Sequence, residues 1–154
     1  MANINNPFGF RLIKGPKDTE TLNTTSNLTV YEGAPLVRKA DGTLGVAGAT
    51  STGLFGFACH GVTGETGVRK PLMFFPATFD RVFEAQAATG TTVNLTEAVG
   101  KAVGVSATAT YAVVKMDATT SVLQTVGWNS NSDLDASCAV LRVVVAKSTY
   151  VGVP

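Results

Sequence analysis

The sequence predicts an all-β fold, namely a β-barrel or β-sandwich body with an extended N-terminal arm and at most one short helix. Short runs rich in Val, Leu, Phe and Thr recur along the chain, with Gly, Pro, Asn or Asp turn signals between them. No long helical period appears. With 154 residues, the chain suits a single domain whose core needs no disulfide support.

The first part of the chain, residues 1–27, is predicted to be an arm, and residues 28–154 the body. Asn, Gly and Pro residues interrupt any regular pattern in the arm. If this segment is extended, Phe8, Phe10 and Leu12 project to one side, because side chains alternate along a strand. Two alternatives follow: the arm folds back on its own domain or, as we favour, it reaches a neighbouring subunit.

Residues 70–86 are predicted to be the packing centre of the body, since they hold half of the eight Phe residues. The continuous apolar run at residues 72–75 is typical of a strand buried on both faces. Pro76 has no N–H to donate and therefore predicts a break in the ladder. Alternation over residues 79–85 predicts a second strand, nearer an edge of the sheet.

Turn and cap residues predict the other elements. Asp41-Gly42 is a strong hairpin signal. Asn94 is a candidate N-cap for a helix of one or two turns within residues 95–103, which Gly100 weakens. The other predicted strands lie at residues 28–31, 34–38, 44–47, 111–116, 122–128 and 138–147.

The composition narrows the choice of partners. Charged residues make up 15% of the chain and the net charge is +1, so no basic field exists to hold nucleic acid or an anionic membrane. No apolar run is long enough to span a bilayer, and residues 1–7 lack the basic start and the apolar core of a signal peptide, so we expect synthesis and folding in a cytoplasm. Cys59 and Cys138 both lie in apolar runs and are predicted to be buried thiols. A weakly charged surface also suits a protein that is docked in an assembly.

The sequence offers no catalytic, metal or cofactor constellation. His60 is the single histidine, and no pattern brings it to Cys138 as the base of a nucleophile. One His with two distant Cys is not a recognisable zinc set. Asn131, Asp133 and Asp135 lack the central Gly and the distal Glu of a calcium loop. We therefore expect no enzyme, no metal and no cofactor.

Several stretches resemble the capsid decoration (cement) proteins of tailed bacteriophages. The stretches that carry the resemblance are residues 1–3, 6–11, 33–37, 53–57, 75–77 and 82–86, followed by strands near 112–116, 123–128 and 139–145. Its most specific parts are the Phe-Gly-Phe of the arm and the Pro-Ala and Phe-Glu-Ala-Gln of residues 75–86. Leu12 follows Arg11 where the family pattern would have Pro.

The resemblance implies a structural virion protein that binds the outer surface of an expanded capsid and stabilises the shell, with the arm clamping neighbouring subunits. It implies the major capsid protein and further copies of the chain, as a trimer or dimer, as partners, and a location on the capsid surface of the virion after synthesis in the host cytoplasm. The partner-binding residues that we predict are Phe8, Phe10, Arg11, Leu12 and Ile13.

Two other function classes remain open. The first is a host- or glycan-binding β-sandwich module of a phage fibre or spike, and its candidate contacts are Tyr111, Trp128, Asn129 and Asn131. The second is a hydrolase, which would need His60 in a cleft beside a nucleophile. The hydrophobic N-terminal arm separates the first from a cement protein, because a glycan-binding module has no need of one.

Overall fold

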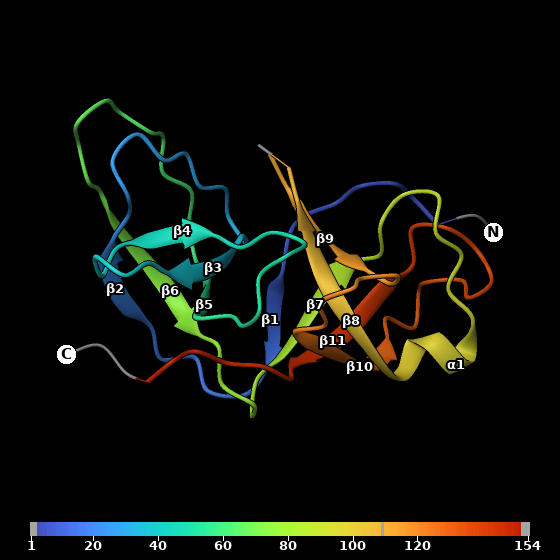
Figure 1. Cartoon of the computed structure of the whole chain (residues 1–154). Helices are drawn as coiled ribbons and strands as arrows, with labels where there is room; N and C mark the ends of the chain where they lie inside the picture. Colours follow the sequence, from blue (N-terminus) through green and yellow to red (C-terminus); the bar gives the residue numbers. More distant parts are fainter. Residues whose placement is uncertain (1–2, 109, 152–154) are drawn as a thin grey trace.

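The computed structural model describes residues 3–108 and 110–151, and over these it contains eleven β-strands and one short α-helix (Figure 1). The prediction of an all-β body with at most one short helix is confirmed. The elements are β1 (Arg11–Lys14), β2 (Glu20–Asn23), β3 (Pro35–Arg38), β4 (Leu44–Val46), β5 (Gly56–Ala58), β6 (Pro71–Pro76), β7 (Val82–Gln86), α1 (Leu95–Ala98), β8 (Val99–Ala107), β9 (Ala112–Lys115), β10 (Leu123–Trp128) and β11 (Val140–Val145).

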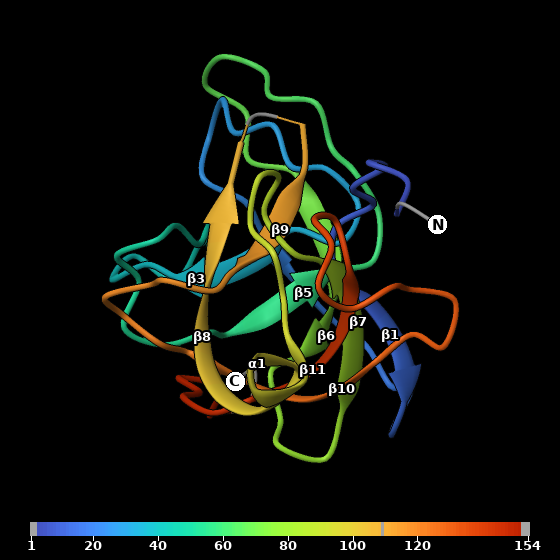
Figure 2. The same ribbon diagram turned by 90° about the vertical axis from the view of Figure 1, so that its right-hand side faces the viewer.

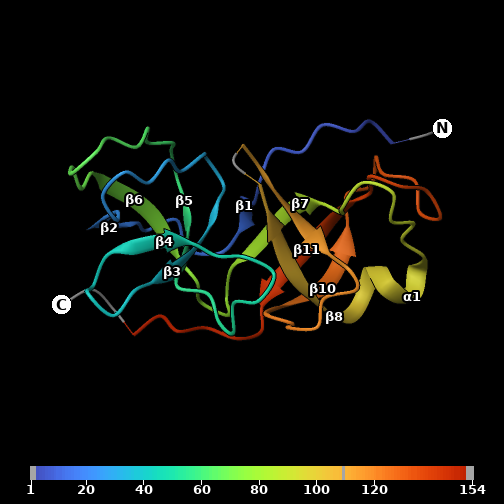
Figure 3. The same cartoon turned by 45° about the horizontal axis from the view of Figure 1, so that its top comes forward.

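The strands form two antiparallel sheets that lie side by side (Figures 1 and 3). Sheet A has six strands in the order β1-β7-β11-β10-β8-β9, and sheet B has five in the order β2-β6-β5-β3-β4. The chain passes from sheet A to sheet B between β1 and β2, and it returns between β6 and β7. β1 and β7, which lie together near the junction of the two sheets, begin and end these crossings.

Each sheet bends round and is closed by a parallel bridge between two of its strands. In sheet A, Val114 of β9 bridges Ala87, the residue that follows β7. In sheet B, Leu44 of β4 bridges Thr24, the residue that follows β2. Such closure pairs strand edges that would otherwise be open. It leaves β1 attached to the outside of the ring that β7, β11, β10, β8 and β9 form.

Two hydrophobic cores fill the body. The larger extends from the inside of sheet A to Phe57 of sheet B, where the Phe57 ring packs 4.1 Å from Phe83 and 5.2 Å from Phe10. The smaller fills sheet B around Phe55 and Phe74, whose ring centroids are 5.5 Å apart. The stacking of rings from β5, β7 and the N-terminal segment (residues 3–14) joins the two sheets.

The packing centre at residues 70–86 does form two strands, but their burial is the reverse of the prediction. In β6 only alternate residues are fully buried, and Met73 is 42% exposed, because the outer face of sheet B is open there. β7 is the more buried strand, since β1 and β11 flank it and the N-terminal segment covers its outer face. Glu84 on that outer face is consequently 3% exposed.

Local signals account for the helix and the hairpin. Asn94 accepts from the Glu97 N–H, and the Glu97 carboxylate accepts from the Asn94 N–H, which is a capping box. The helix ends after one turn because Val99 is extended and Gly100 has φ +82°, which confirms the prediction of one or two turns within residues 95–103. Asp41-Gly42 does turn between β3 and β4. The strand predicted at residues 28–31 is reduced to a single bridge from Val30.

Arg81 fixes the crossing between the sheets. Its side chain is 3% exposed, and its Nε donates to the Pro16 carbonyl at 2.9 Å. Its Nη2 donates to the carbonyl and the carboxylate of Asp18, at 3.2 and 2.8 Å, and its Nη1 donates to the Thr78 hydroxyl. One guanidinium therefore ties the β1–β2 connection to the β6–β7 connection.

None of the described helices is long and apolar enough to cross a membrane.

Candidate functional site

The N-terminal segment packs against its own chain. Phe10 is 4% exposed, and its N–H donates to the Gly33 carbonyl at 2.9 Å. The preceding Gly9 has φ +76°, and a Cβ at this position would lie 2.8 Å from the Glu32 carbonyl oxygen, so only glycine allows this close approach. The Phe-Gly-Phe motif thus inserts Phe10 beside Phe57 in the core of the same molecule.

The five predicted partner-binding residues consequently differ in their availability. Phe10 is buried and Leu12 packs against the larger core, so neither is free to anchor a neighbour. Phe8 is half-buried and lies under the Arg11 guanidinium, 4.7 Å from its ring centroid. Ile13 is 38% exposed on β1, beside a bulge in the pairing with β7. Arg11 and Ile13 are the members of the set that solvent reaches most readily.

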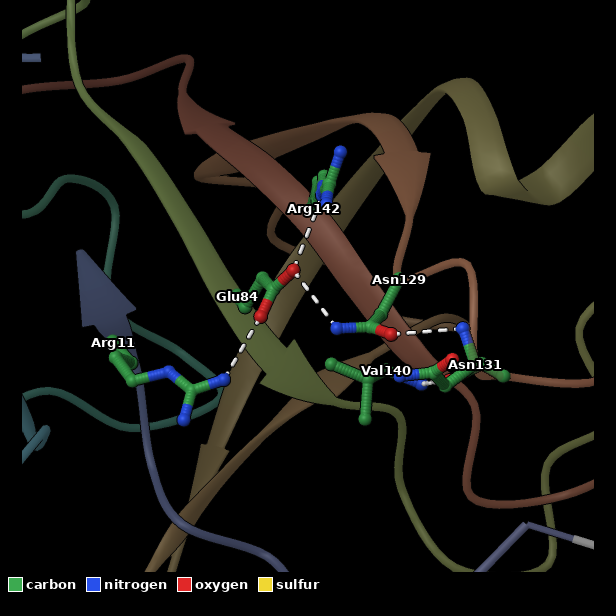
Figure 4. Close-up of polar contacts among 7 residues, drawn as sticks. Arg11, Glu84, Asn129, Asn131, Val140 and Arg142 are labelled. Atoms are coloured by element: carbon green, nitrogen blue, oxygen red, sulfur yellow. Dashed lines mark hydrogen bonds and ion pairs between the residues drawn. The ribbon is translucent and has the colours of Figure 1, made fainter. Parts of the chain in front are cut away.

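A buried carboxylate on β7 organises the polar face next to β1. Glu84 Oε2 accepts from Arg11 Nη2 at 3.0 Å, and Glu84 Oε1 accepts from Arg142 Nε at 3.1 Å and from Asn129 Nδ2 at 3.3 Å (Figure 4). Arg11 and Arg142 lie opposite Glu84 on the neighbouring strands β1 and β11. Their side chains are 61% and 44% exposed, against 3% for Glu84. One shielded anion therefore holds two cations at the surface.

Burial and hydrogen bonding act in opposite directions on Glu84. Burial favours the neutral acid, but the hydrogen bonds from Arg11, Arg142 and Asn129 favour the carboxylate, and the net result is a pKa below the ordinary value. The lower folded-state pKa stabilises the fold at pH values above the unfolded-state pKa. This contribution is lost as the pH falls through the folded-state pKa.

We expect Glu84→Gln to lower the free energy of unfolding by about 1–3 kcal/mol at neutral pH, because it weakens two charge-assisted hydrogen bonds. The difference from the wild type should shrink below the ordinary glutamate pKa of 4.5, where the wild-type side chain also becomes protonated. Urea unfolding over a pH series measures it. Glu65→Gln, at an ion pair with a 63% exposed carboxylate, is the control and should change little. A difference in unfolding free energy that does not depend on pH would show that the charge of the Glu84 carboxylate does not stabilise the fold.

A pocket of about 390 Å³ lies between the N-terminal segment and the loop at residues 129–133. Asn3 holds the two walls together: its Nδ2 donates to the carbonyls of Asp133 and Ser137 at 2.8 and 2.9 Å, and its Oδ1 accepts from the Asp133 N–H at 2.7 Å. Gln86 of β7 is 1% exposed; its Nε2 donates to Asn5 Oδ1, and its Oε1 accepts from the Asn6 N–H. The N-terminal segment is thus bound along its length by side-chain hydrogen bonds.

The candidate contacts of a glycan-binding module separate into two groups. Asn129 and Asn131 line the pocket together with Phe8 and Arg11, and the Asn131 N–H donates to Asn129 Oδ1 at 2.9 Å. Trp128 instead packs against the larger core. Tyr111 lies in the connection between β8 and β9, where its carbonyl accepts from the Thr108 N–H at 2.8 Å. The structure therefore brings together two of the four.

The residues considered for hydrolysis do not form a catalytic arrangement. His60 Nε2 accepts from the Met73 N–H at 3.1 Å, and its Nδ1 lies 3.2 Å from the Gly61 carbonyl, so both ring nitrogens contact the main chain. Cys59 and Cys138 are free thiols, half-buried and buried respectively. Burial, together with the charge of Glu32, raises the pKa of Cys59 to about 11, which disfavours the thiolate. Among the described residues, no three His, Cys, Asp or Glu side chains gather closely enough to hold a metal ion.

Comparison with known proteins identifies no relative. No protein-family model matches the chain, and neither do any curated protein or solved structure. The role of the polar network around Glu84 therefore follows from its geometry alone.

Sequence reasoning missed Glu84, Gln86 and Arg142. Glu84 and Gln86, two polar residues at alternate positions in the Phe-rich stretch of residues 70–86, were the signal in the sequence that the outer face of β7 is also covered.

Proposed function

We propose that this protein is a structural virion protein that binds the outer surface of an expanded phage capsid and stabilises the shell. The observation that carries the proposal is that the N-terminal segment is folded into the body and presents part of β1 to solvent. The Phe-Gly-Phe of the resemblance, residues 8–10, folds into the body and leads directly into β1, which places Ile13 and Arg11 at the surface. The proposed partners are the major capsid protein and further copies of this chain.

The rigid attachment of β1 changes how the N-terminal segment would clamp a neighbour. A free arm loses conformational entropy when it docks, whereas a segment already held by Glu84 and Gln86 loses much less. In the proposed mechanism β1 therefore contacts a neighbouring capsid subunit as part of the folded body. A protein that binds the expanded shell and not its precursor stabilises the expanded state by mass action. Many copies on one shell raise the total avidity.

The test is co-sedimentation of the full-length chain with expanded capsids of its phage. We expect saturable, stoichiometric pelleting with expanded shells and much weaker pelleting with unexpanded ones. Ile13→Asp should lower the apparent affinity about tenfold or more, because a carboxylate would have to be desolvated at the contact. Val68→Asp, in a sheet B loop, is the matched control, since Ile13 and Val68 are both 38% exposed. Melting temperatures establish that both variants fold.

Point variants are needed because deleting residues 1–27 would remove β1 and β2, which pair with β7 and β6. Absence of saturable pelleting by the wild type would contradict the proposed function. Equal effects of the two variants would contradict the placement of the contact at β1.

A second candidate function is glycan binding by a fibre or spike module, which the pocket favours. Asn6, Asn129 and Asn131 line it beside the Phe8 ring, and amides next to an aromatic ring suit the hydroxyls and the apolar face of a sugar. If the wild type does not pellet with capsids but binds host surface glycans, and Asn131→Ala weakens that binding, the result would support this second function.

A further inference from the structure

The outer side of β1 is an open sheet edge in a molecule that pairs its other sheet ends. β9 meets Ala87 and β4 meets Thr24, and the Ala88 and Thr25 N–H groups donate across these two junctions at 3.0 Å. β1 pairs with β7 on one side, and no described strand lies on the other. Figure 2 shows β1 at the outer margin of its sheet. Exposed edges of this kind are the usual sites where a partner strand is added.

The charges along this edge are mostly positive. Lys14 ends β1 and Lys17 follows it; both are exposed, and neither forms an ion pair with a described residue. The acidic groups nearby are already engaged: Glu84 binds two arginines, Asp18 binds Arg81, and the Asp80 carboxylate accepts from the Thr78 hydroxyl. The hydrogen bond from the Thr78 hydroxyl leaves the negative charge of Asp80 in place, so the two lysines stand against one carboxylate and the net charge beside β1 is positive.

We propose that the occupant of this edge is an extended acidic segment of the capsid subunit, which pairs with β1 through main-chain hydrogen bonds. Its carboxylates would face Lys14 and Lys17, and an apolar side chain would cover Ile13. This inference rests on the proposed function and adds the partner's chemistry and its place of attachment. A second copy of this chain is disfavoured, because pairing two β1 edges would bring their basic side chains together, and like charges opposite each other are destabilising.

The test combines charge reversal with hydrogen exchange, again on the full-length chain and expanded capsids. Lys14→Glu should weaken pelleting about tenfold, since it replaces an attraction with a repulsion at each bound copy, and high salt should reduce the difference. Lys39→Glu, at an exposed lysine of the sheet B hairpin, is the charge-matched control and should bind as the wild type does. On binding, the amides within residues 11–14 that point away from β7 should exchange about tenfold more slowly, because a paired strand must open before it exchanges.

The possible outcomes distinguish a failure of the β1-edge proposal from a failure of the proposed capsid binding. If the wild type pellets but Lys14→Glu pellets equally well and the β1 amides remain unprotected, the edge proposal is overturned and capsid binding stands. If the wild type does not pellet, both are overturned. Protection of β1 in concentrated protein without capsids would identify a second copy as the occupant and would also overturn the proposal.

Discussion

Phe57→Ala is expected to lower the free energy of unfolding by about 3–5 kcal/mol. The Phe57 side chain is fully buried, and its ring centroid lies 4.1 Å from that of Phe83 and 5.2 Å from that of Phe10. Truncation would leave a cavity where β5, β7 and the N-terminal segment meet, and rigid strands on three sides cannot collapse into it. Since domains of this size are stable by about 5–15 kcal/mol, the loss is a large fraction of the total. Urea unfolding with an unchanged m-value measures it.

The matched control for this variant is Phe79→Ala. Phe79 is 66% exposed in the turn between β6 and β7, so its removal should change the stability by no more than about 0.5 kcal/mol. Phe57→Ala should also loosen Phe10, and amide exchange at residues 8–14 should accelerate more than the global destabilisation explains. A cost below about 1 kcal/mol, or unchanged exchange at these residues, would show that Phe57 does not hold the N-terminal segment.

Local chemistry made several elements of the fold predictable. The Asp41-Gly42 turn requires a residue that tolerates positive φ, and Gly42 adopts φ +84°. The helix start at Asn94 follows from a side chain that accepts from the Glu97 N–H in the first turn of the helix. Both signals act within four residues, so the sequence displays them directly. The alternation of short apolar runs and turns likewise indicates strands without any knowledge of their partners.

The position of the N-terminal segment was not predictable in the same way. A period-two row of apolar side chains looks the same whether it covers its own core or a neighbour's surface, so Phe8, Phe10 and Leu12 could not decide between the two. The deciding contacts are distant in sequence. Arg11 and Glu84 are 73 residues apart, and Asn3 and Asp133 are 130 apart. Nothing local specifies such pairs, because they depend on which strands become neighbours.

The end of the helix and the burial of β7 depend in the same way on contacts that are distant in sequence. Residues 99–103 have acceptable helix propensity, but pairing of β8 with β10 places them in a sheet, and this tertiary contact overrides a weak preference. The break at Pro76 and the alternation over residues 79–85 predict a strand nearer an edge of the sheet, and Glu84 and Gln86 lie on one of its faces. They are buried nevertheless, since the N-terminal segment supplies their hydrogen-bond partners.

Arg81→Met is the second change with a large expected effect, a loss of about 2–4 kcal/mol of unfolding free energy. A methionine fills much of the volume but donates nothing to the carbonyls of Pro16 and Asp18 or to the Thr78 hydroxyl. Hydrogen bonds from a charged donor contribute about 1.5–3 kcal/mol each, and rehydration of the exposed acceptors offsets part of their loss. The ion pair itself adds little, because the Asp18 carboxylate is 70% exposed. High salt should therefore leave the difference nearly unchanged.

Arg69→Met separates this linkage from an ordinary surface ion pair. Arg69 is 55% exposed and lies 3.4 Å from the Asp41 carboxylate, so its loss should cost less than about 1 kcal/mol. Arg81→Lys should recover little, since one ammonium cannot reach acceptors on both connections as the planar guanidinium does. If Lys restored full stability, charge alone would be sufficient. If it does not, and exchange at residues 15–19 accelerates, the geometry of Arg81 is what holds β1 to the junction of the two sheets and keeps its open edge in place.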